Sequence, residues 1–376
     1  MTRPPAGGRA VAWVDAGAVE RNCRSLADRL DRDARLCAVV KADGYGHGAR
    51  ACAEAALRGG AEVLAVAAAE EAVELRAGFP EVPILVMGAL TGEEVRAALS
   101  ARAEVAVWRG RFGELCARLA AESGEPARVH VKYDSGMGRL GERDPDTVVE
   151  LAAACASDPN LNLAGVWTHL ATADEDDDAY MRSQLDAFAA VVARVREIEP
   201  AVIAHAANSA ATIREPASHL DMVRCGVAIY GLDPFQRDPA ASGLEPALAL
   251  VSWVADVKRF ERGDSAGYGR TWAATEPTWV GVLPIGYADG VRRALSNNAE
   301  VLVRGRRHPL VGTVSMDNLT IDLGPETEVE PGDEAVLIGA QGDDRILAEE
   351  LARSAGTINY EIATGIGPRV PRVAGS

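Results

Sequence analysis

The chain has 376 residues, of which 48% are hydrophobic and 25% are charged, a balance typical of a folded globular protein and not of a disordered one. Its 55 acidic and 39 basic residues give a formal net charge of −16, which disfavours nucleic acid and acidic membrane surfaces as partners. No stretch approaches the roughly 20 apolar residues of a membrane-spanning helix, and the N-terminus lacks the apolar core of a signal peptide. We therefore expect a cytoplasmic protein.

The six cysteines lie far apart and include no Cys-x-x-Cys pair. This spacing offers neither a zinc site nor a compact disulfide framework. We expect reduced, mostly buried thiols and no metal.

Short apolar runs alternate with helical patterns over the first two thirds of the chain, and these runs predict buried parallel strands. They are Leu36–Val40, Glu62–Val66, Ile84–Met87, Glu104–Trp108, Arg128–Lys132, Ala164–Thr168, Val202–His205 and Met222–Cys225. Helices are predicted from stripes of apolar residues at helical spacing. One stripe is Val19, Cys23, Leu26 and Leu30, and a second, within residues 178–198, is Met181, Leu185, Phe188, Val191 and Val195.

Eight such strand and helix units in roughly 240 residues predict a closed (β/α)8 barrel. An open doubly wound sheet is the alternative, but the usual G-x-G-x-x-G after the first strand is absent. From about residue 246 the pattern becomes mostly β, with turn signals such as PGD and one short helix at Leu347–Ala355. The sequence thus predicts a barrel domain over residues 1–245 and a mostly β domain over 246–376.

Polar side chains follow the ends of several predicted strands, and the carboxyl ends of barrel strands form the active-site face. Lys41 ends the first run, and a lysine emerging from a buried strand can become a Schiff-base nucleophile. Further candidates follow the fifth to eighth runs: Lys132, Arg139, His169, Asn208, Ser209, Arg224, Gly226, Val227 and Tyr230. Because barrels commonly bind phosphate after strands seven and eight, we expect a phosphorylated ligand facing Lys41.

The segment AVVKADGYGHG resembles the signature of the lysine that binds pyridoxal 5′-phosphate in alanine racemases. Further motifs follow in that family's order and approximate spacing: VKYDSGMGRLG, WTHLATAD, HAANSAA, RCGVAIYG, GYGRTW, GYADG, VSMDN and TINYE. The resemblance covers roughly residues 10–373. It implies an isomerase that interconverts L- and D-alanine by a two-base mechanism and supplies D-alanine for peptidoglycan.

The resemblance makes Lys41 both the cofactor lysine and one catalytic base, and Tyr268 the second base. Racemisation needs one group to remove the α-proton and another to return a proton from the opposite face. Tyr268 would come from the partner subunit of a homodimer and would be linked through His169 to Arg224, which would face the pyridine nitrogen. The remaining cofactor contacts implied are Tyr45, Arg139, Asn208, Ser209, Gly226, Val227 and Tyr360.

Substrate contacts implied by the resemblance are Arg139, Tyr287 and Met316, the last two from the partner subunit, with Asp317 supporting that loop. Lys132 matches a lysine that is often carbamylated in the family. Ser315, where many relatives have cysteine, and Trp272 depart from the family pattern.

Three other functions stay open. A racemase of another small amino acid such as serine, or of broad specificity, would have the same two-domain organisation over the whole chain. An amino-acid decarboxylase is disfavoured because Arg224 occupies the pyridine-nitrogen position and no cysteine lies beyond Cys225. A non-catalytic pyridoxal phosphate carrier would need neither the β domain nor Tyr268.

Overall fold

The computed structural model describes residues 8–31 and 33–375 of the chain. These residues form two compact units. The first, called here the barrel unit, comprises Val19–Gly44 and Ala49–Ile229. The second, called the β unit, comprises residues 8–18, the short segment Tyr45–Gly48 and residues 230–375.

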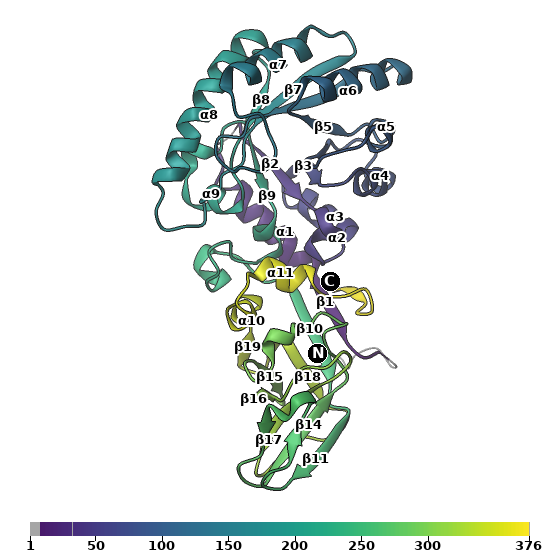
Figure 1. The fold of residues 1–376 in the computed structure, drawn as a ribbon, viewed down its shortest axis with the longest axis vertical. Helices are drawn as coiled ribbons and strands as arrows, with labels where there is room; N and C mark the ends of the chain where they lie inside the picture. Colours follow the sequence, from purple (N-terminus) through teal and green to yellow (C-terminus); the bar gives the residue numbers. More distant parts are fainter. Residues whose placement is uncertain (1–7, 32, 376) are drawn as a thin grey trace. The chain divides into compact units, whose positions relative to one another are not determined.

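Eight parallel strands form the sheet of the barrel unit (Figure 1). They are β2 (Arg35–Val39), β3 (Ala61–Val66), β4 (Ile84–Val86), β5 (Glu104–Val107), β6 (Ala127–Lys132), β7 (Leu161–Trp167), β8 (Ile203–His205) and β9 (Met222–Cys225). The order β8-β7-β6-β5-β4-β3-β2-β9 places β8 and β9 at its two ends. Backbone bonds from Asp221 to Ala204 and from Arg224 to Ala207, 3.1 and 3.0 Å long, join these ends, so the barrel is nearly closed. The predicted barrel is confirmed.

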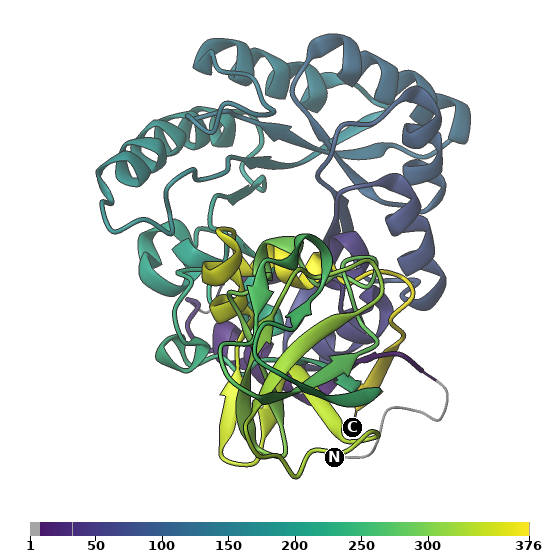
Figure 2. The same ribbon diagram turned by 60° about the horizontal axis from the view of Figure 1, so that its bottom comes forward.

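Helices flank these strands on the outside, as Figures 1 and 2 show. They are α1 (Ala16–Ala27), α3 (Ala49–Arg58), α4 (Ala69–Gly78), α5 (Gly92–Ser100), α6 (Gly110–Ser123), α7 (Pro145–Ser157), α8 (Ala179–Ile198) and α9 (Ser209–Arg214). The local sequence determines where several of these helices begin or end. Thr91 caps α5 by accepting from the Glu94 amide, and Gly124 ends α6 at a φ of 80°.

Two positions in the predicted helical stripes differ from the structure. Leu30 lies beyond α1, because backbone bonds of i to i−3 type at Arg29 and Leu30 tighten the chain into a turn. In α8, Gln184 is buried whereas Leu185 is only half-buried. A polar residue therefore faces the barrel, and it takes part in the site described below.

The β unit contains a ten-stranded sheet in the order β11-β14-β17-β16-β15-β18-β10-β1-β20, with β19 paired to β18. Its strands are β1 (Val11–Asp15), β10 (Leu248–Trp253), β11 (Asp256–Phe260), β14 (Thr278–Leu283), β15 (Glu300–Val303), β16 (Arg306–Val311), β17 (Leu319–Gly324), β18 (Glu334–Gln341), β19 (Asp344–Ile346) and β20 (Arg372–Gly375). The short strands β12 (Ser265–Ala266) and β13 (Trp272–Ala273) pair separately, and two helices, α10 (Ala348–Ala355) and α11 (Asn359–Thr364), complete the unit.

The mostly β character predicted beyond residue 246 is confirmed, as is the helix at α10. Strand β1 was not predicted, and it pairs with β10 and β20 of the β unit although it lies at the start of the chain. The division into residues 1–245 and 246–376 stays a prediction about where the folding domains meet.

All six cysteines are buried, and burial raises the pKa of every one of their thiols. The prediction of buried thiols is confirmed. Within the described residues, no helix has the length and apolarity that a membrane crossing requires.

Candidate active site

Lys41 opens the one-turn segment α2 (Lys41–Tyr45), directly after strand β2. Ala42 and Asp43 both adopt φ 51° and ψ 50°, the left-handed region that is costly for residues with a side chain. The Asp43 carboxylate holds the turn by accepting a 2.8 Å hydrogen bond from the Ala49 amide. Backbone strain of this kind is often stored at active sites, where the surrounding bonds maintain it.

The environment of Lys41 favours its neutral amine. Burial lowers the pKa of Lys41, the positive charge of Arg139 lowers it further, and the negative charge of Glu71 opposes both effects. A neutral amine is the form that attacks a carbonyl carbon. The sequence-based choice of Lys41 as a nucleophile is thus chemically consistent with its surroundings.

Lys132 is the last residue of β6, and its side chain points into the barrel with 2% of its surface exposed. Burial lowers its pKa to about 7, and the positive charges of Arg224 and Arg139 contribute to the shift. Its Nζ atom lies 4.1 Å from the centroid of the Trp167 ring. Lys132 is therefore close to half neutral near pH 7, which is unusual for a lysine.

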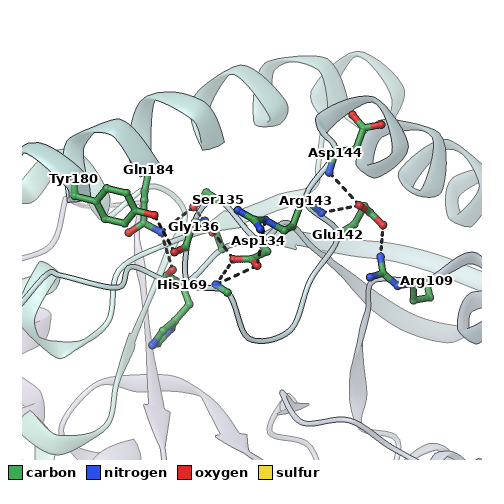
Figure 3. A network of polar contacts seen from close by, with 12 residues as sticks. Arg109, Asp134, Ser135, Gly136, Glu142, Arg143, Asp144, His169, Tyr180 and Gln184 are labelled. Atoms are coloured by element: carbon green, nitrogen blue, oxygen red, sulfur yellow. Dashed lines mark hydrogen bonds and ion pairs between the residues drawn. The ribbon is translucent and has the colours of Figure 1, made fainter.

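The loop that follows β6 carries Arg139 and is held by two carboxylates (Figure 3). The Asp134 side chain accepts hydrogen bonds from the amides of Gly136 and Gly138, at 3.2 and 2.9 Å. Further along, the Glu142 carboxylate forms an ion pair with Arg109. These contacts fix the path of the loop while the Arg139 side chain stays exposed.

Gln184 of α8 connects this loop to the segment after β7, as Figure 3 shows. Its amide nitrogen lies 3.3 Å from both the Ser135 hydroxyl and the His169 carbonyl oxygen, and its amide oxygen accepts from the Ala171 amide at 2.9 Å. Tyr180, one turn earlier in α8, donates to the Gly136 carbonyl at 3.0 Å. Helix α8 thereby holds two loops of the candidate site in a fixed relation.

Arg224 and His169 lie within hydrogen-bond distance of each other. Nη2 of Arg224 lies 3.3 Å from Nδ1 of His169, and it also donates to the Thr168 and Ala206 carbonyl oxygens at 2.8 and 2.9 Å. Burial, followed by the charge of Arg224, lowers the pKa of His169 well below its usual value. Burial also lowers the pKa of Arg224, but only to about 10, so Arg224 stays protonated near neutral pH. His169 is then a neutral acceptor beside a cation.

Ser209 and the segment after β9 form a compact group of polar atoms. The Ser209 side chain is 4% exposed, and its Oγ accepts hydrogen bonds from the amides of Gly226 and Ala228, at 3.0 and 3.3 Å. Asn208 acts as the N-cap of α9, accepting from the Ala211 amide at 3.1 Å. A hydroxyl and amides at this place in a barrel are the donors that a phosphate group needs.

Four cations act on one another in the barrel unit. Arg139 lowers the pKa of Lys41, and Arg224, Arg139 and Lys41 all lower that of Lys132. Such a cluster fits a ligand with several negative charges. Pyridoxal 5′-phosphate and an amino-acid carboxylate together provide a phosphate, a phenolic oxygen and a carboxylate, so the donors present fit this cofactor.

The β unit contains a second group of candidate residues. Tyr45 lies with its ring centroid 5.1 Å from that of Tyr230 and 6.2 Å from that of Tyr360, and His47 stacks on Tyr230 at 4.5 Å. Position 46, between Tyr45 and His47, requires a glycine. Its φ is 81°, and a Cβ atom there would lie 2.5 Å from the Ala363 carbonyl oxygen. Tyr45 and Tyr360, both implied as phosphate contacts, are thus neighbours.

Tyr268, Tyr287 and Met316 lie on exposed loops of the β unit, with 75%, 44% and 52% of their surfaces exposed. These loops are joined by hydrogen bonds. The Thr313 hydroxyl donates to the Tyr268 carbonyl at 2.8 Å, and the Tyr287 amide donates to the Ser315 carbonyl at 3.0 Å.

Asp317 supports the Met316 loop, as the resemblance implied. Its carboxylate accepts a 2.9 Å hydrogen bond from Arg369, whose Nε donates to Asp289 at the same distance. Ser315 closes the turn by donating to the Asn318 carbonyl at 2.7 Å. The Trp272 ring lies 6.3 Å from the Phe260 ring and packs within the β unit.

Sequence reasoning missed several polar residues that hold the site: Glu71, Asp134, Gln184, His205, His130 and Glu104. A signal existed for three of them. Gln184 interrupts an apolar helical stripe, and His130 and His205 interrupt apolar strands. Buried polar residues of this kind need partners, so each interruption was a cue to a network.

The chain matches the family described as alanine racemase, N-terminal domain, over residues 14–234, and alanine racemase, C-terminal domain, over residues 247–374. The alanine racemase of Symbiobacterium thermophilum is 45% identical over 366 residues, which cover 97% of this chain and 96% of that protein. The alanine racemase of Frankia casuarinae is 41% identical over 376 residues, covering 98% and 97% of the two chains.

A solved structure of alanine racemase from a D-cycloserine-producing Streptomyces lavendulae superposes with a TM-score of 0.94 at 37% identity, and covers 99% of this chain and 98% of that chain. Likeness at this level extends over both compact units of the chain. The chain belongs to the alanine racemase family.

Proposed function

We propose that this chain is an isomerase that interconverts L- and D-alanine, with pyridoxal 5′-phosphate as cofactor and Lys41 and Tyr268 as its two bases. The observation that carries the proposal is the Lys41 amine, held by a strained turn at the end of a barrel strand, with a pKa lowered by burial and by Arg139. The curated relatives that cover nearly the whole chain are alanine racemases, which favours alanine over serine as the substrate.

When bound, the cofactor would supply an electron-withdrawing ring that acidifies the α-carbon of the amino acid. Lys41 would hold it covalently, and Arg224 would donate a hydrogen bond toward the ring nitrogen. Because Arg224 keeps its proton at neutral pH, it cannot transfer that proton to the ring. The ring would then withdraw electrons only moderately, which favours return of the proton over side reactions.

Ser209, Gly226 and Val227 would bind the phosphate in the barrel unit. The family resemblance adds Tyr45 and Tyr360 to the phosphate contacts. Asn208 would keep the start of α9 in place, because its side chain already caps that helix. Arg139 would bind the substrate carboxylate and the phenolic oxygen of the cofactor.

Proton transfer would use groups on two sides of the α-carbon. Lys41 would remove or return the proton on one face, and the Tyr268 hydroxyl on the other. An ordinary tyrosine pKa of about 10 leaves little phenolate at pH 7. His169 is held neutral by burial and by Arg224. Because its Nδ1 faces the donor-only Arg224 guanidinium, its proton is on Nε2, and this N–H would donate a hydrogen bond to the Tyr268 oxygen and stabilise the phenolate.

Lys132 would carry a carbamate. Its pKa of about 7 leaves a substantial fraction of neutral amine, which is the form that bonds to the carbon of CO2 and then loses a proton. The resulting anion would lie beside Arg139 and orient its guanidinium.

The active form would be a homodimer in which Tyr268, Tyr287 and Met316 reach the site of the partner subunit. The exposure of these three residues on loops bonded to one another supports this arrangement. A supply of D-alanine for peptidoglycan, in the cytoplasm, would be the physiological role.

The test is proton NMR of the purified chain with pyridoxal 5′-phosphate and L-alanine in D2O, together with chiral analysis. Loss of the α-proton signal with formation of D-alanine supports the racemase. Loss of the α-proton without D-alanine would show one-sided exchange and exclude Tyr268 as the second base. The same pair of measurements with L-serine tests the alternative substrate, and no exchange with either amino acid would favour a carrier.

A further inference from the structure

A continuous chain of hydrogen bonds runs through the interior of the barrel, starting at Arg224 in the active site. Nη1 of Arg224 lies 2.8 Å from Nδ1 of His205, and Nε2 of His205 lies 2.9 Å from Nδ1 of His130. Nε2 of His130 lies 2.5 Å from the carboxylate of Glu104, the first residue of β5. The chain thus connects the carboxyl end of the barrel to its amino end.

The direction of every hydrogen bond in this chain follows from Arg224, because a guanidinium can only donate. Nδ1 of His205 must accept, so the single proton of a neutral His205 ring is on Nε2. That proton points at Nδ1 of His130, which must therefore also accept. His130 is then neutral with its proton on Nε2, donating to Glu104.

The barrel interior is shaped to hold these rings. The side chains of His205, His130 and Glu104 are 0%, 1% and 6% exposed. Gly165 of β7 leaves the room for His130, since a Cβ atom at that position would lie 2.1 Å from its Nδ1. The Trp167 ring packs nearly parallel to the His205 ring, with an interplanar angle of 7° and 5.6 Å between the ring centroids.

Of the four residues joined by these hydrogen bonds, Arg224, His205, His130 and Glu104, only Glu104 is an anion. Burial alone would raise the pKa of Glu104, but the hydrogen bond from His130 and the ion pair with Arg128, at 2.6 Å, outweigh burial and lower this pKa. Among the described residues, Arg224 has no carboxylate partner of its own, and its other hydrogen bonds go to two carbonyl oxygens and to His169. Glu104 is thus the anionic end of the chain that Arg224 begins.

We propose that Glu104, acting through His130 and His205, is a positioning residue that fixes the Arg224 guanidinium in the active site. The anion at one end holds both imidazoles in the tautomer that Arg224 needs as an acceptor. Without an acceptor at position 104, the His130 proton loses its partner, both rings can change tautomer, and Arg224 can meet another donor at His205 Nδ1. The expected effect of Glu104 on the rate of racemisation rests on the proposed function. The expected tautomers of His130 and His205 do not depend on it.

Three variants of the full chain separate this role from general stability. Glu104→Met removes the acceptor but retains the side-chain length. Glu104→Gln removes the charge but retains an oxygen that can accept from His130. Arg128→Met is the matched control, because it removes the other partner of Glu104 and leaves the histidine chain intact.

The primary readout is long-range ¹H–¹⁵N correlation NMR of histidine-labelled protein, with and without pyridoxal 5′-phosphate. The six histidines make assignment by single His→Asn variants practical. We expect neutral Nε2–H tautomers for His130 and His205 in the unchanged chain, in Arg128→Met and in Glu104→Gln. The Nε2 proton of His130 should lie far downfield in the first two, and should move upfield in Glu104→Gln because a neutral amide oxygen is a weaker acceptor than a carboxylate. Glu104→Met should lose that proton signal and show mixed tautomers.

The second readout is racemisation. Glu104→Met should lower kcat about ten- to hundredfold with little change in KM, as expected when a hydrogen bond to a charged group in the site is misplaced. Glu104→Gln and Arg128→Met should retain most of kcat. Nδ1–H or charged forms of His130 or His205 in the unchanged chain would overturn the proposal, and so would equal losses of kcat in all three variants. Correct tautomers in a chain without racemase activity would instead refute the proposed function and leave the role of Glu104 standing.

Discussion

Oε1 of Glu71 accepts a 2.6 Å hydrogen bond from the amide of Ala42, the residue that follows the catalytic lysine candidate. The other carboxylate oxygen, Oε2, accepts from the amides of Ala67 and Ala68, at 2.9 and 3.1 Å. One side chain at the start of α4 therefore holds the left-handed turn of Lys41 and also places a negative charge near its amine.

Replacement of this carboxylate should change both properties. In Glu71→Gln the amide nitrogen cannot accept, so the turn loses bonds and the free energy of unfolding should fall by about 1–3 kcal/mol. The charge of Glu71 raises the pKa of Lys41, so its loss should lower that pKa further. The pH profile of cofactor attachment should therefore move to lower pH. Glu70→Gln, at the exposed neighbouring position, is the control and should leave both measurements unchanged.

The attachment site can be identified with few alternatives, because the chain has only three lysines, at positions 41, 132 and 258. Borohydride reduction of the cofactor-loaded protein and peptide mapping should find the label on Lys41 alone. Lys41→Ala should lose activity and the visible absorbance of the bound cofactor together. Lys258→Ala, an exposed lysine paired with Asp256, should retain both. Visible absorbance that survives washing in Lys41→Ala would contradict the assignment.

Lys132 should form a carbamate that isotope labelling can detect. With ¹³C-bicarbonate we expect a carbamate signal in the ¹³C NMR spectrum that disappears in Lys132→Met and persists in Lys258→Met. The pKa of about 7 predicts that labelling increases as pH rises through neutrality, because the neutral amine is the reactive form. A signal lost equally in both variants, or absent in the unchanged chain, would exclude carbamylation of Lys132.

In buffer free of CO2, Lys132 should make stability depend on pH. The unfolded lysine, with a pKa near 10.5, still binds a proton that the folded one releases at about 7. The free energy of unfolding should therefore rise between these two pH values, by at most about 5 kcal/mol, and stay low beneath them. Urea unfolding across this range should show a flatter profile for Lys132→Met, with higher stability at neutral pH.

Tyr268→Phe should leave cofactor binding intact and impair proton transfer on one face only. Deuterium from solvent should then enter the α-position at strongly different rates for L- and D-alanine. Since Tyr268 is exposed in the single chain, the melting temperature should barely change. Exchange at unchanged rates for both enantiomers would remove Tyr268 from the mechanism.

The sequence allowed the barrel to be predicted because its parallel strands are buried on both faces and appear as separate apolar runs. All eight predicted runs coincide with observed strands within a few residues. The hydrogen-bond network inside the barrel, in contrast, could not be predicted from these buried strands. His130 and His205 lie within strands, where nothing local to the sequence tells which distant side chain receives their hydrogen bonds.

Two other differences have the same origin in long-range contacts. Gln184 is one residue away from Leu185, and only the loops against which α8 packs determine which of the two is buried. Strand β1 has a short apolar pattern whose partners lie more than two hundred residues later, at β10 and β20. Hydropathy is a local property and cannot identify such partners.

The pairing of β1 also bears on the order of events during synthesis. Every strand of the barrel unit has been made once residue 225 has left the ribosome, so that sheet can assemble from the nascent chain. Strand β1 precedes all of these strands in the described chain, but its parallel neighbour β20 begins only at Arg372. Until β20 has been made, one edge of β1 has unpaired backbone groups, a state that invites pairing with other chains. A strand that is made early is thus among the last to be protected.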